Sequence, residues 1–195
     1  MSQISLWKGL CADFSPDPIL IDDLIGKRMR KAGFKGSRSR GKCTFASTCK
    51  SQAECYTDGE GTLVRAVPAV GTLISWSPDT PDLIMAFETF LKNEYWNEAP
   101  WASPRAFDII VDIQGCISTF DRYLQLMPRS RVIPQIVDQY LSTISVEEVI
   151  YASDAQMTEA LGDHEGEVWI TGPCTLVPVT ETSKTCIGNP IQVAA

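Results

Sequence analysis

The sequence contains very little of what most catalytic sites need. Its 195 residues include a single histidine, His164, so any Ser-His-Asp or Cys-His mechanism has only one candidate base. The sequence also lacks the G-x-S-x-G, glycine-rich phosphate-loop, H-E-x-x-H and calcium-loop motifs. These absences favour a structural or interaction protein over an enzyme of the common classes, and we expect no cofactor.

Long apolar runs are missing as well. No stretch approaches the roughly 18 apolar residues of a membrane-spanning helix. The first residues, 1–8, lack the charged start and the apolar run of a secretory signal. The seven cysteines are odd in number and scattered, which favours free thiols in a reducing compartment. We therefore expect an intracellular protein, cytoplasmic or nuclear, or one that is packaged in a virion.

Acidic residues are absent from one short segment near the N-terminus. Eight of the 17 basic residues lie there: Lys27, Arg28, Arg30, Lys31, Lys35, Arg38, Arg40 and Lys42. The formal net charge is -7 for the whole chain and -15 without these eight residues. The segment is therefore expected to act electrostatically, as a basic arm on an acidic body.

The basic segment, residues 27–42, has several candidate partners. Its cations can follow the phosphate chain of RNA or DNA without reading bases, and they can equally attract anionic lipid headgroups. The acidic body, in the same chain or in a neighbouring copy, is a further candidate. The sequence leaves these alternatives open.

Apolar patterning predicts an α+β fold in one domain, with a mainly antiparallel sheet and several short helices, because strands and helices interleave without regular spacing. The chain divides into four segments. Residues 1–33 form an N-terminal segment with an amphipathic helix that Asp17 caps, and residues 34–61 form a flexible basic and polar segment that contains cysteines. Residues 62–180 form a compact α+β core, and residues 181–195 form an irregular tail.

Within the core, individual elements can be placed. Residues 43–61 are expected to be loop with one short strand at most. Strands are expected at 62–67, 70–76, 149–151, 167–171 and 175–180, and helices at 81–95, 118–127, 134–141 and 153–162. The strongest strand pattern is 107–113, in which Phe107, Ile109, Val111 and Ile113 would share one face.

Cys116 is the most specific catalytic candidate. It follows the expected strand at 107–113 and forms a C-x5-R pattern with Arg122, the arrangement that thiol-dependent phosphatases use to bind phosphate. The intervening residues contain no glycine, and Asp121 would place a carboxylate beside the phosphate. A buried structural cysteine is therefore the favoured interpretation.

Metal and interface candidates complete the sequence-based hypotheses. Cys43, Cys49 and Cys55 recur at equal intervals, but zinc sites use closer pairs and four ligands, so no metal site is expected. Trp96 and Trp101 lie in a proline-rich stretch and are candidate interface anchors.

These observations together predict a non-enzymatic assembly protein, such as a viral capsid- or matrix-type subunit. It would form homo-oligomers and use its basic arm to contact nucleic acid, an anionic membrane or a neighbouring subunit. A small thiol-dependent phosphatase or hydrolase that uses Cys116 and Arg122 is one alternative. A monomeric regulatory adaptor is the other.

Overall fold

Seven antiparallel strands form one sheet. The computed structural model of the chain describes residues 4–10, 20–36, 43–57 and 61–179. The strands are β1 (Trp7–Leu10), β2 (Thr44–Ser47), β3 (Thr62–Pro68), β4 (Leu73–Trp76), β5 (Glu147–Ile150), β6 (Glu167–Thr171) and β7 (Cys174–Pro178). Their order in the sheet is β5-β4-β6-β2-β1-β3-β7, and every neighbouring pair is antiparallel. The expectation of a single α+β fold with a mainly antiparallel sheet is confirmed.

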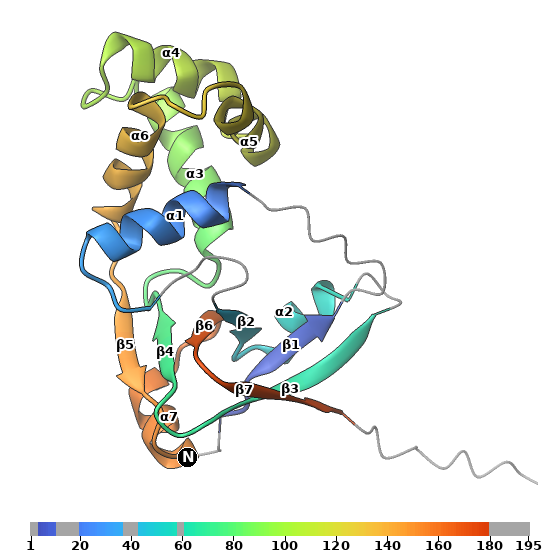
Figure 1. Cartoon of the computed structure of the whole chain (residues 1–195). Helices are drawn as coiled ribbons and strands as arrows, with labels where there is room; N and C mark the ends of the chain where they lie inside the picture. Colours follow the sequence, from blue (N-terminus) through green and yellow to red (C-terminus); the bar gives the residue numbers. More distant parts are fainter. Residues whose placement is uncertain (1–3, 11–19, 37–42, 58–60, 180–195) are drawn as a thin grey trace, which may run out of the picture.

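Seven helices accompany the sheet in the described part of the chain. They are α1 (Leu20–Lys31), α2 (Lys50–Cys55), α3 (Leu83–Trp96), α4 (Pro104–Ile113), α5 (Ile117–Leu126), α6 (Val132–Leu141) and α7 (Asp154–Leu161). Figure 1 shows α3 to α6 gathered at one end of the molecule, with α1 beside them on the side toward the sheet. None of these seven helices combines the length and the apolar character that crossing a membrane requires.

Strand β6 joins the two halves of the hydrophobic core because it is buried on both faces. Successive side chains of a strand point to opposite faces, and here Trp169 joins one hydrophobic cluster while Val168 and Ile170 join another. The larger cluster unites Trp169 with α1, α3, α4, α5 and α6. The smaller cluster packs the opposite face against Met157 and Leu161 of α7.

Most element positions expected from the sequence agree with the structure. Strands β3 to β7 and helices α3, α5, α6 and α7 lie where periodicity and turn residues place them. Ser153 caps α7 by accepting a hydrogen bond from the Gln156 N–H at 3.3 Å. Helix α3 is capped by Asp82, whose carboxylate accepts the N–H groups of Ile84 and Met85.

The first 61 residues contain elements that the sequence did not reveal. Strand β2 is the short strand allowed for residues 43–61, but helix α2 follows it unpredicted. Strand β1 was also missed. It has four residues, all half-buried, and its partners are β3, from Thr62 to Arg65, and Ser47 of β2. A strand this short carries no readable alternation, so its existence depends on pairing with residues far along the chain.

The strand expected at 107–113 is wrong, because these residues belong to helix α4. Ser103 caps the helix by accepting the Ala106 N–H at 3.3 Å, and Pro104 occupies its first position. The run F-D-I-I-V-D-I fits the period of a strand and that of a helix, and the Ser-Pro start is the signal that distinguishes them.

The helical assignment changes which side chains of this segment face the core. Ala106, Ile109, Ile110 and Ile113 are buried at helical spacing. Asp108 and Asp112, one turn apart, are exposed on the opposite side. These two aspartates therefore lie on a solvated helix surface and not on a sheet face.

Substitutions at two adjacent residues distinguish helix from strand in solution. Ile110 is fully buried in α4, so we expect Ile110→Ala to lower the free energy of unfolding by roughly 2–5 kcal/mol. Val111 is only half-buried, and Val111→Ala should cost less than about 1 kcal/mol because alanine also favours the helix. Denaturant unfolding measures both values. A strand would reverse the order, since Val111 would then face the core with Ile109.

Candidate functional site

Helix α1 carries the first half of the basic segment. Ile21, Ile25 and Met29, spaced by four residues, are fully buried against the larger hydrophobic cluster. Acidic residues occupy the first turn of the helix and basic residues the last turn, which complements the helix dipole. The expected cap, Asp17, lies outside the described residues. One side of α1 is thus committed to the core, and the other side is available to carry charge.

Three carboxylates of the acidic body hold α1 and the residues that follow it. Asp121 of α5 accepts the N–H groups of Leu20 and Ile21, at 3.2 and 2.8 Å, at the start of α1. Asp138 of α6 forms a two-bond ion pair with the Arg28 guanidinium near the end of the helix. The third carboxylate, Glu148, acts just beyond the helix.

Glu148 of β5 fixes the residues that follow α1. Its carboxylate accepts the N–H groups of Lys35 and Gly36, at 3.2 and 2.5 Å, and the Ser75 hydroxyl at 3.4 Å. Gly36 is buried so closely that a Cβ atom there would lie 1.9 Å from the Ser75 hydroxyl oxygen. Only glycine fits this approach of the chain to the sheet.

This attachment divides the basic segment into engaged and exposed cations. Arg28 is used within the chain, and the side chain of Arg30 is half-buried. Lys27, Lys31 and Lys35 are exposed, and none of them forms an ion pair with another described residue. Lys27 and Lys31 lie one turn apart on the same side of α1, and Lys35 follows the helix end. Arg38, Arg40 and Lys42 lie outside the described residues.

The two candidate interface tryptophans have different environments. Trp96, at the end of α3, is 77% exposed and touches Tyr95 edge-on. Trp101 is half-buried, stacks on Phe90 at 6.2 Å between ring centroids, and donates its indole N–H to Glu94. Trp101 therefore packs against its own chain, and Trp96 is the one that presents a large apolar surface to solvent.

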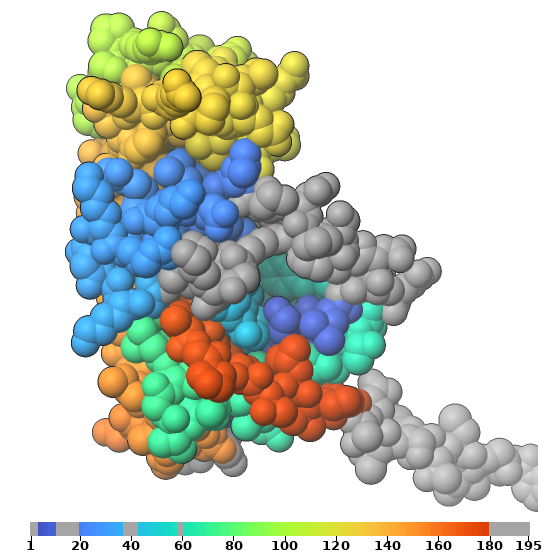
Figure 2. Space-filling view, viewed as in Figure 1, coloured from blue at the N-terminus to red at the C-terminus, as the bar shows by residue number. Residues whose placement is uncertain are grey.

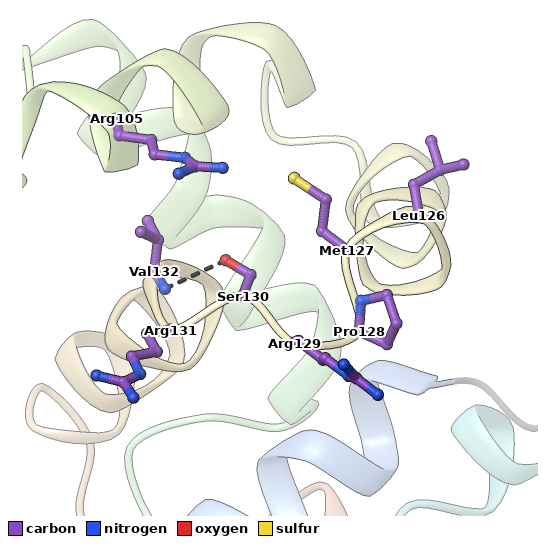
Figure 3. Close-up of a pocket in the computed structure, with 8 residues that line it drawn as sticks. All are labelled: Arg105, Leu126, Met127, Pro128, Arg129, Ser130, Arg131 and Val132. Atoms are coloured by element: carbon purple, nitrogen blue, oxygen red, sulfur yellow. Dashed lines mark hydrogen bonds between the residues drawn. The ribbon is translucent and has the colours of Figure 1, made fainter.

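A group of arginines that the sequence analysis did not single out lines an open hollow at the helical end. Arg105 of α4 lies across from Arg129 and Arg131 of the α5–α6 connection, around a volume of about 550 Å³ (Figure 3). The available signal was the stretch 122–137, which contains three arginines and no acidic residue. Arg105 joins them only through the fold.

The structure places Cys116 and Arg122 apart. Cys116 directly precedes α5, and Arg122 lies in the second turn of that helix, so the residues between them form no phosphate-binding loop. Six helical rises of about 1.5 Å each separate the two by about 9 Å along the axis. Cys116 is exposed, which corrects the expectation of a buried cysteine. The structure therefore gives no support to the phosphatase alternative.

Cys116 is nevertheless chemically distinct. The Ser118 hydroxyl, 3.0 Å from its sulfur, and the Thr119 N–H lower the pKa of the thiol to about 7.

The evenly spaced Cys43, Cys49 and Cys55 form no metal centre: within the described ranges, no three His, Cys, Asp or Glu side chains are placed to hold an ion.

The chain resembles no known protein in the comparisons: no family model, no curated protein and no solved structure matches it.

The lowered pKa of Cys116 gives a pH-dependent prediction. Alkylation of this thiol by iodoacetamide should rise through a midpoint at about pH 7, since the thiolate is the reacting species. Ser118→Ala removes the largest stabilising hydrogen bond and should move the midpoint upward. Mass spectrometry of the modified peptide across a pH series measures it. An unchanged midpoint in Ser118→Ala would contradict the assigned cause.

Proposed function

We propose that this protein is a non-enzymatic assembly subunit, of the capsid or matrix type, that contacts a polyanion through its basic segment. The observation that carries the proposal is the row of exposed lysines on α1 and just beyond it, Lys27, Lys31 and Lys35, which form no ion pair with any other described residue although α1 is anchored to the body. Ammonium groups that are free of carboxylate partners retain their attraction for phosphate. Nucleic acid and anionic membrane are the candidate polyanions.

Anchoring makes α1 a better binding surface than a free tail. The core contacts of α1 and the Arg28–Asp138 ion pair hold the helix before any partner arrives. Lys27 and Lys31 therefore do not need to lose backbone freedom on binding, which reduces the cost of association. The acidic body of one copy can, in turn, attract the basic segment of another copy.

Self-association is the second part of the proposal, and Trp96 supports it. A tryptophan at 77% exposure on an ordered helix end is the kind of residue that anchors protein interfaces. Figure 1 places the end of α3 near α4, in the helical end of the molecule and away from the sheet.

The lysine row is tested by replacing Lys27, Lys31 and Lys35 together with glutamine. Binding of single-stranded RNA or of anionic vesicles should weaken at low salt. For RNA, the slope of log affinity against log salt should fall in magnitude by about 2, since each phosphate contact contributes roughly 0.7. Fluorescence anisotropy and vesicle co-sedimentation provide the measurements.

A matched control removes three exposed cations elsewhere, at Lys50, Arg65 and Lys92. This variant has the same net charge as the lysine-row variant and should retain most of the binding. Equal losses in the two variants would contradict a role specific to α1.

Self-association is tested by light scattering across a salt series. Oligomers should form at low ionic strength and dissociate as salt rises, because exposed charges more than about 10 Å apart are screened at 0.1 M salt. Trp96→Ala should weaken the association by roughly tenfold. Val70→Ala, at an equally exposed apolar residue in the turn between β3 and β4, should leave it unchanged. A monomer at every ionic strength would favour the adaptor alternative.

A further inference from the structure

The hollow between the start of α4 and the α5–α6 connection combines positive charge with apolar surface. Arg105, Arg129 and Arg131 are exposed, and none of them pairs with a carboxylate among the described residues. Figure 3 shows the guanidinium of Arg105 and the sulfur of Met127 pointing into the hollow from opposite sides, whereas Arg129 and Arg131 lie at its lower edge with their guanidinium groups turned outward. Leu126, at the end of α5, is 69% exposed.

Three of the four acidic residues of α4, α5 and α6 are engaged in other contacts. Asp121 and Asp138 bind α1, through its first N–H groups and through Arg28. Asp112 accepts the hydroxyl of Tyr123. The exposed Asp108 lies one turn from Arg105 without forming an ion pair with it. Asp112, Asp121 and Asp138 thus lie in other contacts, and since Asp108 does not pair with Arg105, the guanidinium groups remain available to an external anion.

The backbone N–H groups at the start of α6 do not provide this attraction. The Ser130 hydroxyl already accepts the N–H groups of Val132 and Ile133, at 3.2 and 3.5 Å. The guanidinium groups are therefore the donors that an anion would meet. Arginine favours phosphate in particular, because its planar fork of N–H groups matches two phosphate oxygens at once.

We propose that the surface around this arginine hollow binds the phosphate-bearing headgroups of an anionic phospholipid membrane, with Leu126 entering the apolar layer of the membrane. The site lies outside the basic segment and goes beyond the function proposed above. A lipid surface offers a partner for both features of the hollow: phosphate for the arginines and acyl chains for the exposed leucine. RNA offers a partner for only the first feature, because the lining contains no aromatic or amide side chain on which a base could stack or pair.

The charge contribution is tested with the triple variant Arg105→Gln, Arg129→Gln, Arg131→Gln in the full chain. The probes are vesicles of phosphatidylcholine alone and vesicles that also contain phosphatidylserine or phosphatidylinositol bisphosphate. Each arginine near an anionic surface contributes about fivefold to the partition coefficient, so the triple variant should bind acidic vesicles on the order of 100-fold more weakly. The variant at Lys50, Arg65 and Lys92 controls for net charge.

The apolar contribution is tested separately with Leu126→Ser. This variant should bind acidic vesicles on the order of tenfold more weakly, because one leucine side chain no longer leaves water. Its affinity for a soluble inositol phosphate, measured by calorimetry, should not change, whereas the triple arginine variant should lose that affinity too. Since all four residues are exposed, thermal unfolding should be unaltered in both variants.

Three results would overturn the proposal. The first is a triple arginine variant that binds acidic vesicles as well as the charge-matched control. The second is full vesicle binding by Leu126→Ser, which would leave a site for free phosphate only. The third is loss of RNA binding with vesicle binding intact, which would assign the hollow to nucleic acid. The lysine-row variant, measured in parallel, reports on the basic segment independently of the hollow.

Discussion

The ion pair between Arg28 of α1 and Asp138 of α6 is the interaction on which the arrangement of charge in this protein depends. It joins the most basic element of the described chain to an otherwise acidic body. Asp121 and Glu148 extend the attachment to the start of α1 and to the residues beyond its end. These contacts add direction to the non-directional burial of Ile21, Ile25 and Met29, because a hydrophobic face alone permits more than one helix orientation.

A consequence of this attachment is that some charged groups are engaged within the chain while others remain without a partner among the described residues. The carboxylates nearest to α1 are consumed by contacts within the chain, while Lys27, Lys31 and Lys35 and the arginines of the hollow have no carboxylate partner among the described residues. A chain with a formal net charge of -7 can therefore present cationic surfaces at its helical end. Net charge describes solubility and long-range steering, whereas binding depends on where the unpaired charges lie.

The sequence predicted the elements whose signals are local. Ser153 marks the start of α7, and alternation or β-branched residues mark β3, β4 and β6. The prediction of a strand at residues 107–113 was wrong because their apolar pattern fits both the strand period and the helix period. The Ser-Pro start of α4 was not used to decide between the two. Strand β1 was not predicted because it depends on pairing with β3, which is distant in the sequence.

The candidate site was predictable only in part. The concentration of cations at residues 27–42 can be read directly from the sequence, but the engagement of Arg28 cannot, because Asp138 is 110 residues away. The exposure of Cys116 and the burial of one side of Trp101 were likewise decided by tertiary packing. The arginine hollow combines the start of α4 with the α5–α6 connection, of which only the connection is recognisable as a stretch without acids.

The most direct test of this account is a double-mutant cycle on Arg28→Gln and Asp138→Asn, measured by denaturant unfolding. If the ion pair anchors α1, the two substitutions together should cost less than the sum of the single costs, with a coupling energy of about 1 kcal/mol for a partly exposed, two-bond pair. Additive losses, with no coupling, would mean that α1 is held by its buried face and its other contacts, and would contradict the central role of this ion pair.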